Sequence, residues 1–160
     1  MKAVSFLENE ILGLIAVIEE NYGIRSIEFL KGKKERERLL RSFKESPLTK
    51  ECIKQLKEYF LGKRKKFDIK LDIVGTEFQK SAWQALLKIP YGKTISYSEQ
   101  AKMIKNEKAI RAIGGANGKN NLPILIPCHR VIGKNGDLVG YSGGIDIKIY
   151  LLELEKKYSM

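Results

Sequence analysis

The spacing of the hydrophobic residues changes near residue 75, and this change limits the architectures that the chain can adopt. Before it, apolar stretches separated by turn signals are typical of strands in an antiparallel meander. These strands are expected at residues 3–7, 11–18 and 24–30. Apolar and charged residues then alternate from Phe67 to Ile73, which predicts an extended segment. We therefore place a domain boundary near residues 70–76, between domains 1–72 and 73–160.

One helix is expected within the first domain. From Leu48 onward the apolar residues recur at spacings of three and four until Gly62, which places them on one helical face. Cys52 lies on that face, so we expect it to be part of the core. The charged stretch 31–47 before the helix favours a surface loop or a short helix.

The second domain begins with two capping boxes, in which a hydroxyl residue is followed three positions later by Glu or Gln. Thr76 pairs in this way with Gln79, and Ser96 with Glu99, so a helix is expected to begin after each hydroxyl residue. A turn at Lys105 and Asn106 would then lead to another helix over 107–117. Two short helices joined by a tight turn are the plan of a helix-turn-helix, whose second helix normally enters a groove of DNA.

Composition bounds the class of protein and of partner. No apolar run approaches the roughly 18–20 residues of a membrane span, and acidic residues at Glu8 and Glu10 come too early for a signal peptide. We expect a cytoplasmic protein with no membrane association. One histidine and two distant cysteines cannot supply a structural zinc site, so no metal is expected. A net charge of +11 favours a polyanionic partner, although Lys-rich surfaces also occur in proteins from hot environments.

The helix expected over 107–117 has an unusual composition. Small residues, including Gly114 and Gly115, surround Arg111, the one long cation in the middle of this helix. Each glycine costs a helix about 1 kcal/mol relative to alanine, so packing or function must offset the loss. A nearly bare helix surface suits close approach to a minor groove. Tight packing on neighbouring helices, with Arg111 merely exposed, explains the composition equally well.

A short apolar run between two prolines leads to Cys128 and to His129, the only histidine of the chain. A thiol is a useful nucleophile only as the thiolate, so a cysteine beside a proton acceptor and the cation Arg130 is a candidate reactive cysteine. The alternative is a small buried hydrophobic residue. Downstream, the glycine-rich segment 139–144 suits either a loop around a ligand or a linker, and a helix from Ile145 could bring a carboxylate to His129.

Taken together, these motifs resemble the O6-alkylguanine-DNA alkyltransferases. The similarity covers about half of the chain and is most specific in Pro-Cys-His-Arg-Val at 127–131 and Gly-Tyr-Ser-Gly-Gly at 140–144. It implies an α+β fold, with a ribonuclease-H-like N-terminal sheet and helix in a supporting role. The second domain would be mostly helical, with a winged helix-turn-helix, and would carry DNA binding and the alkyl acceptor.

The resemblance also implies a reaction and its residues. Cys128 would accept the alkyl group irreversibly, once per molecule and without an external cofactor. His129 would take the thiol proton through a bound water, Glu155 would orient the imidazole, and Asn120 would brace the turn. This nucleophile, base and orienter arrangement is chemically sufficient for a reactive thiolate.

The partner implied by the resemblance is double-stranded DNA containing O6-alkylguanine, bound through its minor groove by a monomer. The damaged base must leave the stack before a thiolate can reach it. Tyr97 and Arg111 would extrude the base, and the small residues of the recognition helix would approach the groove. The residues implied in binding DNA and the flipped base are Tyr97, Arg111, Ala112, Gly114, Gly115, Val131, Tyr141, Ser142 and Gly143.

Two departures from the family pattern stand close to these residues. Ile110 occupies a position where relatives usually carry a small residue or proline, and Asn121 replaces a frequent proline. Three other functions stay open: a non-catalytic lesion-binding protein, a winged-helix regulator with a buried cysteine, and a cysteine hydrolase. The first would lack the acceptor cysteine, and the last would leave a basic helix-turn-helix unexplained.

Overall fold

The structure, a computed structural model, describes residues 2–136, 138 and 144–160. The chain divides into two compact units, residues 1–73 and 74–160. Each unit is built around its own core, and each is described by itself.

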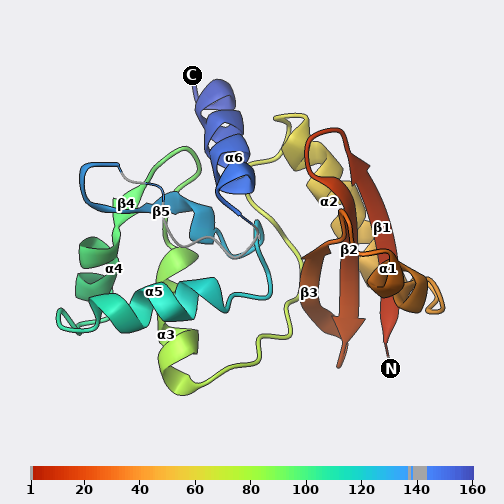
Figure 1. Ribbon diagram of the computed structural model, residues 1–160, viewed down its shortest axis with the longest axis horizontal. Coiled ribbons are helices and arrows are strands. Elements are labelled where there is room, and N and C mark those ends of the chain that lie inside the picture. The colour runs from red at the N-terminus through yellow and green to blue at the C-terminus, as the bar shows by residue number, and fades with distance from the viewer. Residues whose placement is uncertain (1, 137, 139–143) are drawn as a thin grey trace. The chain divides into compact units, whose positions relative to one another are not determined.

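The first unit is built on a three-stranded antiparallel sheet in the order β1-β2-β3 (Figure 1). The strands are β1 (Ala3–Asn9), β2 (Gly13–Glu20) and β3 (Gly23–Phe29). The expected meander is confirmed, but the prediction that Ile11 belongs to a strand is wrong. Ile11 lies in the β1–β2 turn and is 58% exposed, because the side chain of Asn9 accepts hydrogen bonds from the backbone amides of Ile11 and Leu12.

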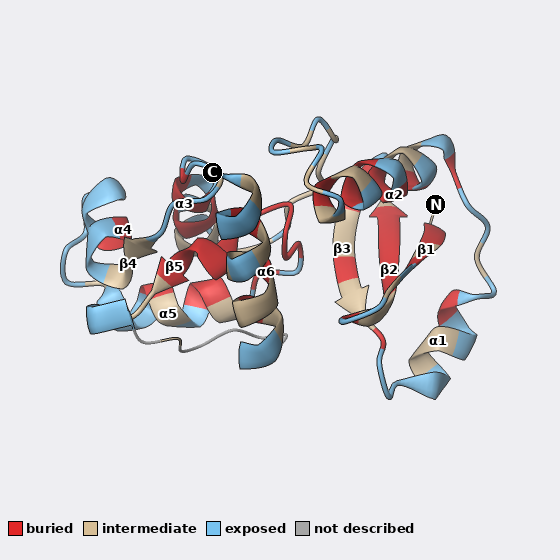
Figure 2. Ribbon diagram, turned by 90° about the horizontal axis from the view of Figure 1, so that it is seen from above, coloured by how far each residue is buried: buried red, intermediate tan, exposed pale blue. Residues whose placement is uncertain are grey.

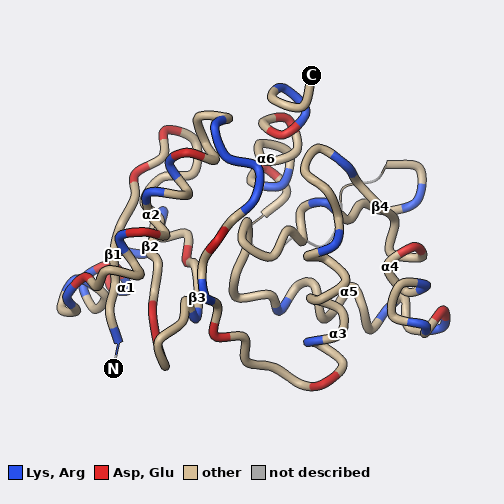
Figure 3. Tube along the Cα trace, turned by 180° about the vertical axis from the view of Figure 1, so that it is seen from behind, with Lys and Arg blue, Asp and Glu red and all other residues tan. Residues whose placement is uncertain are grey.

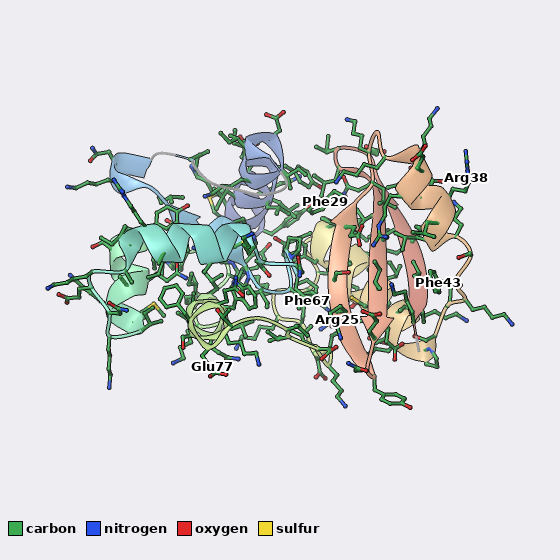
Figure 4. All side chains as sticks on the ribbon, turned by 60° about the horizontal axis from the view of Figure 1, so that its bottom comes forward. Arg25, Phe29, Arg38, Phe43, Phe67 and Glu77 are labelled. Carbon is green, nitrogen blue, oxygen red and sulfur yellow. The ribbon has the colours of Figure 1, made fainter. Side chains whose placement is uncertain are left out.

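Two helices follow the sheet, α1 (Lys34–Leu40) and α2 (Pro47–Phe60). Helix α2 packs against all three strands, and Figure 2 shows β2 almost wholly in the colour of buried residues. Cys52 is fully buried on α2, as expected from its place on the apolar face. On α1, by contrast, Arg38 is exposed and points away from the sheet (Figure 4).

The extended segment that closes the first unit is fixed by one buried side chain. Gln55 of α2 donates from Nε2 to the carbonyl of Asp68 (3.1 Å) and accepts from the amide of Asp68 at Oε1 (2.9 Å). Further on, Leu71 forms a parallel bridge with Ile24 at the start of β3. The extended conformation predicted from the alternating residues is therefore confirmed.

The second unit contains α3 (Glu77–Leu86), α4 (Tyr97–Met103) and α5 (Ile110–Gly118), and both predicted capping boxes are present. Helix α5 begins at Ile110 rather than at Glu107, so its predicted start is wrong. The chain turns at Lys105 with φ +57°, and the amide of Ala109 bonds to the carbonyl of Asn106 before the helix begins. Helices α4 and α5 form the expected helix-turn-helix.

Helix α5 is held in place by polar anchors on its buried face. Trp83 of α3 donates from Nε1 to the carbonyl of Ala116 (2.9 Å). The buried amides of Gln100 and Asn117 bond to each other in both directions, at 2.8 and 3.0 Å. These bonds fix the orientation of α5 relative to α3 and α4, and hence which face of α5 is turned outward.

The remaining elements surround the Cys-His turn. A short parallel pair joins β4 (Ile95–Ser96) to β5 (Val131–Ile132). The 3-10 turns η1 (Cys128–Arg130) and η2 (Lys134–Gly136) precede and follow β5, and α6 (Ile145–Tyr158) ends the chain. The α+β class, with a small antiparallel sheet and then a mostly helical winged unit, is confirmed. In the described residues, no helix combines the length and the apolar character needed to cross a membrane.

Candidate functional site

Cys128 sits in a turn that Asn120 braces from inside. Asn120 donates from Nδ2 to the carbonyl of Ile126 and accepts the amide of Leu122 at Oδ1, both at 2.9 Å. The amide of Cys128 bonds to the carbonyl of Ile126 at 2.8 Å. One buried side chain thus joins two points of the segment that leads to the cysteine, whose side chain remains only 5% exposed.

The environment of Cys128 keeps its thiol protonated at neutral pH. Burial raises the pKa of Cys128 to about 11, although a hydrogen bond from Asn120 and the positive charge of Lys148 act in the opposite direction. The sequence had suggested activation by the neighbouring cation, but burial dominates in the resting protein. Reaction therefore requires a base that removes the proton as the sulfur attacks.

His129 has the properties of that base. Its ring is fully buried, and Nε2 lies 2.6 Å from Oε2 of Glu155. Burial lowers the pKa of His129 despite the nearby carboxylate, so the imidazole is neutral at pH 7. Burial alone would raise the pKa of Glu155, but hydrogen bonds and charges from His129 and Arg130 bring it down to about 2.

These protonation states assign the tautomer of His129. An ionised carboxylate is only an acceptor, so Nε2 carries the proton that it donates to Glu155. Nδ1 is then the basic nitrogen, and it is buried with no hydrogen-bond partner in the described part of the chain. A buried lone pair without a partner is costly, so this nitrogen is available to accept a hydrogen bond or a proton.

Glu155 is the centre of a larger buried network. Its carboxylate accepts bonds from Nε and Nη2 of Arg130 at 2.8 and 3.0 Å, and from the amide of Gly92 at 3.1 Å. Arg130 also donates to the carbonyl of Ile89 at 2.7 Å. Arg130 therefore anchors the turn, a role that its sequence position beside the cysteine did not reveal. Gly92 has φ +77°, and a Cβ there would collide with Ser159.

Lys148 is another buried charge, and its place in the sequence indicated no role for it. It is 1% exposed and donates from Nζ to the carbonyl of Val131 at 2.6 Å. Lys148 and Glu155 are seven positions apart, so α6 presents both on its buried face, together with Leu151. The helix thereby holds the three residues that follow Cys128, through Glu155 at His129 and Arg130 and through Lys148 at Val131.

Tyr97, the first residue of α4, lies within electrostatic range of the cysteine. Its side chain is partly buried, and its pKa is raised by burial and by the charge that Cys128 carries when ionised. The structure thus brings Tyr97, Cys128, His129, Glu155 and Asn120 into one region of the second unit.

The outer face of α5 is open. Arg111, Ala112 and Gly115 are exposed. A Cβ built at Gly114, Gly115 or Gly118 would meet no atom of the described residues within 4 Å. Tight packing on neighbouring helices therefore does not account for these glycines. Exposed lysines at positions 102, 105 and 108 lie on α4 and the turn after it. Figure 3 shows blue Lys and Arg segments around α4.

The sequence matches known families over both units. Residues 77–157 match the 6-O-methylguanine DNA methyltransferase DNA binding domain, and residues 5–73 match the ribonuclease-like domain of the same proteins. The chain belongs to the 6-O-methylguanine DNA methyltransferase family. The resemblance seen in the sequence motifs is confirmed.

Individual members of this methyltransferase family are similar over most of their length. The methylated-DNA–protein-cysteine methyltransferase of Methanosarcina acetivorans is 49% identical over 90% of this chain and 92% of that protein. The constitutive enzyme of Bacillus subtilis is 51% identical over 71% of this chain and 69% of that protein. The crystal structure of the Mycobacterium tuberculosis O6-methylguanine methyltransferase superposes with a TM-score of 0.86, at 40% identity, covering 99% of this chain and 94% of that one.

A structure of the Mycobacterium tuberculosis protein in complex with DNA is also similar, with a TM-score of 0.84 and 38% identity over 98% of this chain and 94% of that one.

Three residues that the family resemblance implies in base binding, Tyr141, Ser142 and Gly143, lie outside the described residues. Val131 is fully buried in β5, and its carbonyl already accepts the bond from Lys148.

Proposed function

We propose that this protein repairs DNA by direct reversal, transferring the alkyl group of O6-alkylguanine irreversibly to Cys128. The observation that carries this proposal is the buried neutral imidazole of His129. Its Nε2 is tied to Glu155 at 2.6 Å, while the basic Nδ1 has no partner in the described residues. A proton acceptor next to a buried thiol suits a nucleophile that is activated only during its reaction.

The chemistry balances with these groups alone. The thiol proton of Cys128 moves to Nδ1 of His129, directly or through one water, as the sulfur attacks the alkyl carbon. A sulfur–carbon bond forms, the bond from that carbon to O6 breaks, and its electron pair leaves with the guanine. The guanine takes a proton from water, and His129 gives the thiol proton up to the solvent, so the net reaction moves one proton from sulfur to the base. The product is a thioether that water does not hydrolyse, so each molecule acts once and needs no external cofactor.

DNA is engaged through the open face of α5. The small residues Ala112, Gly114 and Gly115 let the helix backbone approach the minor groove, and Arg111 enters the stack in place of the extruded base. A planar guanidinium recovers part of the unstacking cost by stacking on neighbouring bases. Tyr97, near the acceptor sulfur, helps to turn the nucleotide. The net charge of +11 supports the phosphate contacts that such docking requires.

The flipped guanine is held by the backbone carbonyls of Cys128 and Val131, with Tyr141, Ser142 and Gly143 on its O6 side. A carbonyl oxygen has two lone pairs, so Val131 can accept a base amine in addition to Lys148. In this scheme residues 73–160 carry both DNA binding and the acceptor, residues 1–72 support them, and the protein acts as a monomer in the cytoplasm.

Incubation with O6-benzylguanine, followed by peptide mapping with mass spectrometry, tests the assignment. We expect one benzyl group per molecule, on Cys128, and no further turnover. Cys52 is an internal control, since burial raises its pKa to about 12 and no base is assigned to it. An unmodified Cys128, as in a purely lesion-binding protein, or continued turnover, as in a hydrolase, would refute the assignment.

A further inference from the structure

Two side chains project from the N-terminal end of an otherwise bare helix surface. At 3.6 residues per turn, Ile110 lies on one stripe with Gly114 and Gly118, and Arg111 lies beside it on the next stripe with Gly115. The glycines have open space where a Cβ would be. Ile110, the first residue of α5, is 45% exposed, so nearly half of its surface lies outside the core of the second unit.

The core of the second unit accounts for the opposite face of α5. Ile113, Ala116 and Asn117 are its buried residues, and they bear the contacts to α3 and α4. Ile110 is not among them. A single exposed hydrophobic residue on a protein surface is ordinary, so exposure alone says nothing about its role. The position of Ile110 indicates its role, because it directly precedes Arg111, which the proposed function places in the DNA stack.

We infer that Ile110 is a DNA-binding residue, an apolar wedge that packs against deoxyribose and base edges in the minor groove beside Arg111. The inference rests on the proposed function and adds a contact to it. Proteins that kink DNA from the minor groove commonly insert isoleucine, leucine or phenylalanine at the deformed step. In this protein the side chain of Ile110 would support the DNA strand beside the space left by the extruded base, which Arg111 fills.

An apolar wedge and a cation leave different signatures in the salt dependence of binding. Each lost phosphate contact reduces the slope of log affinity against log salt by about 1, because fewer counterions are released. Loss of an apolar contact weakens binding by the same factor at every salt concentration. The two contributions can therefore be separated without a structure of the complex.

The experiment measures binding of an undamaged duplex by fluorescence anisotropy over a salt series. Ile110→Ala should weaken binding about fivefold with an unchanged slope, and Ile110→Leu, which keeps the apolar contact, should restore most of the affinity. Lys108→Ala, which removes an exposed charge from the preceding turn, should reduce the slope. Ile11→Ala, at an exposed isoleucine of the first unit, is the matched control and should bind like the parent protein.

Alanine favours helix more than isoleucine does, so weaker binding by Ile110→Ala does not reflect a loss of helix propensity. Ile110 is partly buried, so thermal unfolding of the variant must match that of the parent for the loss to count as a lost DNA contact. Equal or tighter binding by Ile110→Ala, or a changed slope, would overturn the inference. Alkylation of Cys128 and duplex binding by the parent protein are measured separately, to distinguish failure of this inference from failure of the proposed function. If the parent does both and Ile110→Ala has no effect, only the role of Ile110 has failed. If the parent does neither, the proposed function has failed and the wedge fails with it.

Discussion

Nε2 of His129 and Oε2 of Glu155 lie 2.6 Å apart, and both side chains are buried, at 0% and 1% exposure. Because the carboxylate is ionised, this contact places the imidazole proton on Nε2. Nδ1 keeps its lone pair, and Arg130 helps to keep the carboxylate ionised. The consequences can be measured at three levels: the stability of the fold, the reactivity of the thiol, and the repair of DNA.

Replacing Glu155 by glutamine should destabilise the protein by about 3–5 kcal/mol, because Arg130 and His129 lose a buried ionic partner. Urea unfolding measures the loss. Glu153→Gln, at an exposed position of the same helix, is the control and should stay within about 0.5 kcal/mol of the parent. A small effect at Glu155 would mean that the buried network contributes little to folding.

The pH dependence of alkylation should report proton transfer to His129. With O6-benzylguanine, the rate of the parent protein should stay nearly constant from about pH 7 to 9, because the imidazole, with its lowered pKa, is neutral throughout. For His129→Gln the reaction depends on free thiolate. Its rate should be lower and should rise about tenfold per pH unit toward the thiol pKa of about 11. Parallel profiles for both proteins would exclude His129 as the base.

The free energy of unfolding should fall in acid, because the titrations of Glu155 and His129 both lower it as the pH decreases. The pKa of Glu155 is lowered to about 2, so its contribution is complete above the unfolded value near 4.5 and is lost as the pH falls toward 2. The pKa of His129 is also lowered, so the unfolded chain binds an extra proton below about pH 6.5. Thermal unfolding from pH 8 to 3 should show both losses, and Glu155→Gln should show a smaller decline below pH 4.5.

Asn120→Asp should slow alkylation of Cys128 and destabilise the turn. An aspartate cannot donate to the carbonyl of Ile126, and its negative charge opposes formation of the thiolate. The loss of one buried hydrogen bond should cost about 1–3 kcal/mol. Asn121→Asp places the same charge at the adjacent exposed position and should leave both properties near the parent values. Similar losses in both variants would point to a general charge effect.

Arg111→Ala should weaken repair of duplex DNA far more than reaction with the free base, because the proposed function gives Arg111 the place of the extruded base. Single-turnover rates on an O6-methylguanine duplex and on O6-benzylguanine provide the comparison. Arg111→Lys keeps the charge but removes the planar group that stacks on bases, and should restore duplex repair only in part. Equal losses on both substrates would show that Arg111 does not act on the base stack.

Much of the fold could be predicted because local signals agreed with the final packing. The capping boxes at Thr76 and Ser96 set two helix starts correctly. Helix α5 carries no side-chain cap, so nothing in the sequence marked Ile110 as its first residue. The second strand was expected to begin at Ile11, and this start was also wrong. The side chain of Asn9 accepts a hydrogen bond from the amide of Ile11, and this turn outweighs the β propensity of isoleucine.

The site was harder to predict than the fold, because burial depends on tertiary contacts. The sequence placed Cys128, His129 and Glu155 in one hypothesis through family resemblance, and it could not show that the thiol has a raised pKa. It also gave Arg130 and Lys148 no structural role. Charged residues usually face solvent, and only the packed structure shows that these two are enclosed with their partners.

The buried face of helix α6 consists of three residues, and two of them, Lys148 and Glu155, are charged. Such a helix gains little from leaving water until partners are in place to receive those charges. Val131, His129 and Arg130 are those partners, and all belong to the segment of the acceptor. Burial of the last helix and completion of the reactive turn should therefore occur as one cooperative folding event, so that a chain with an unfinished core also has no working nucleophile.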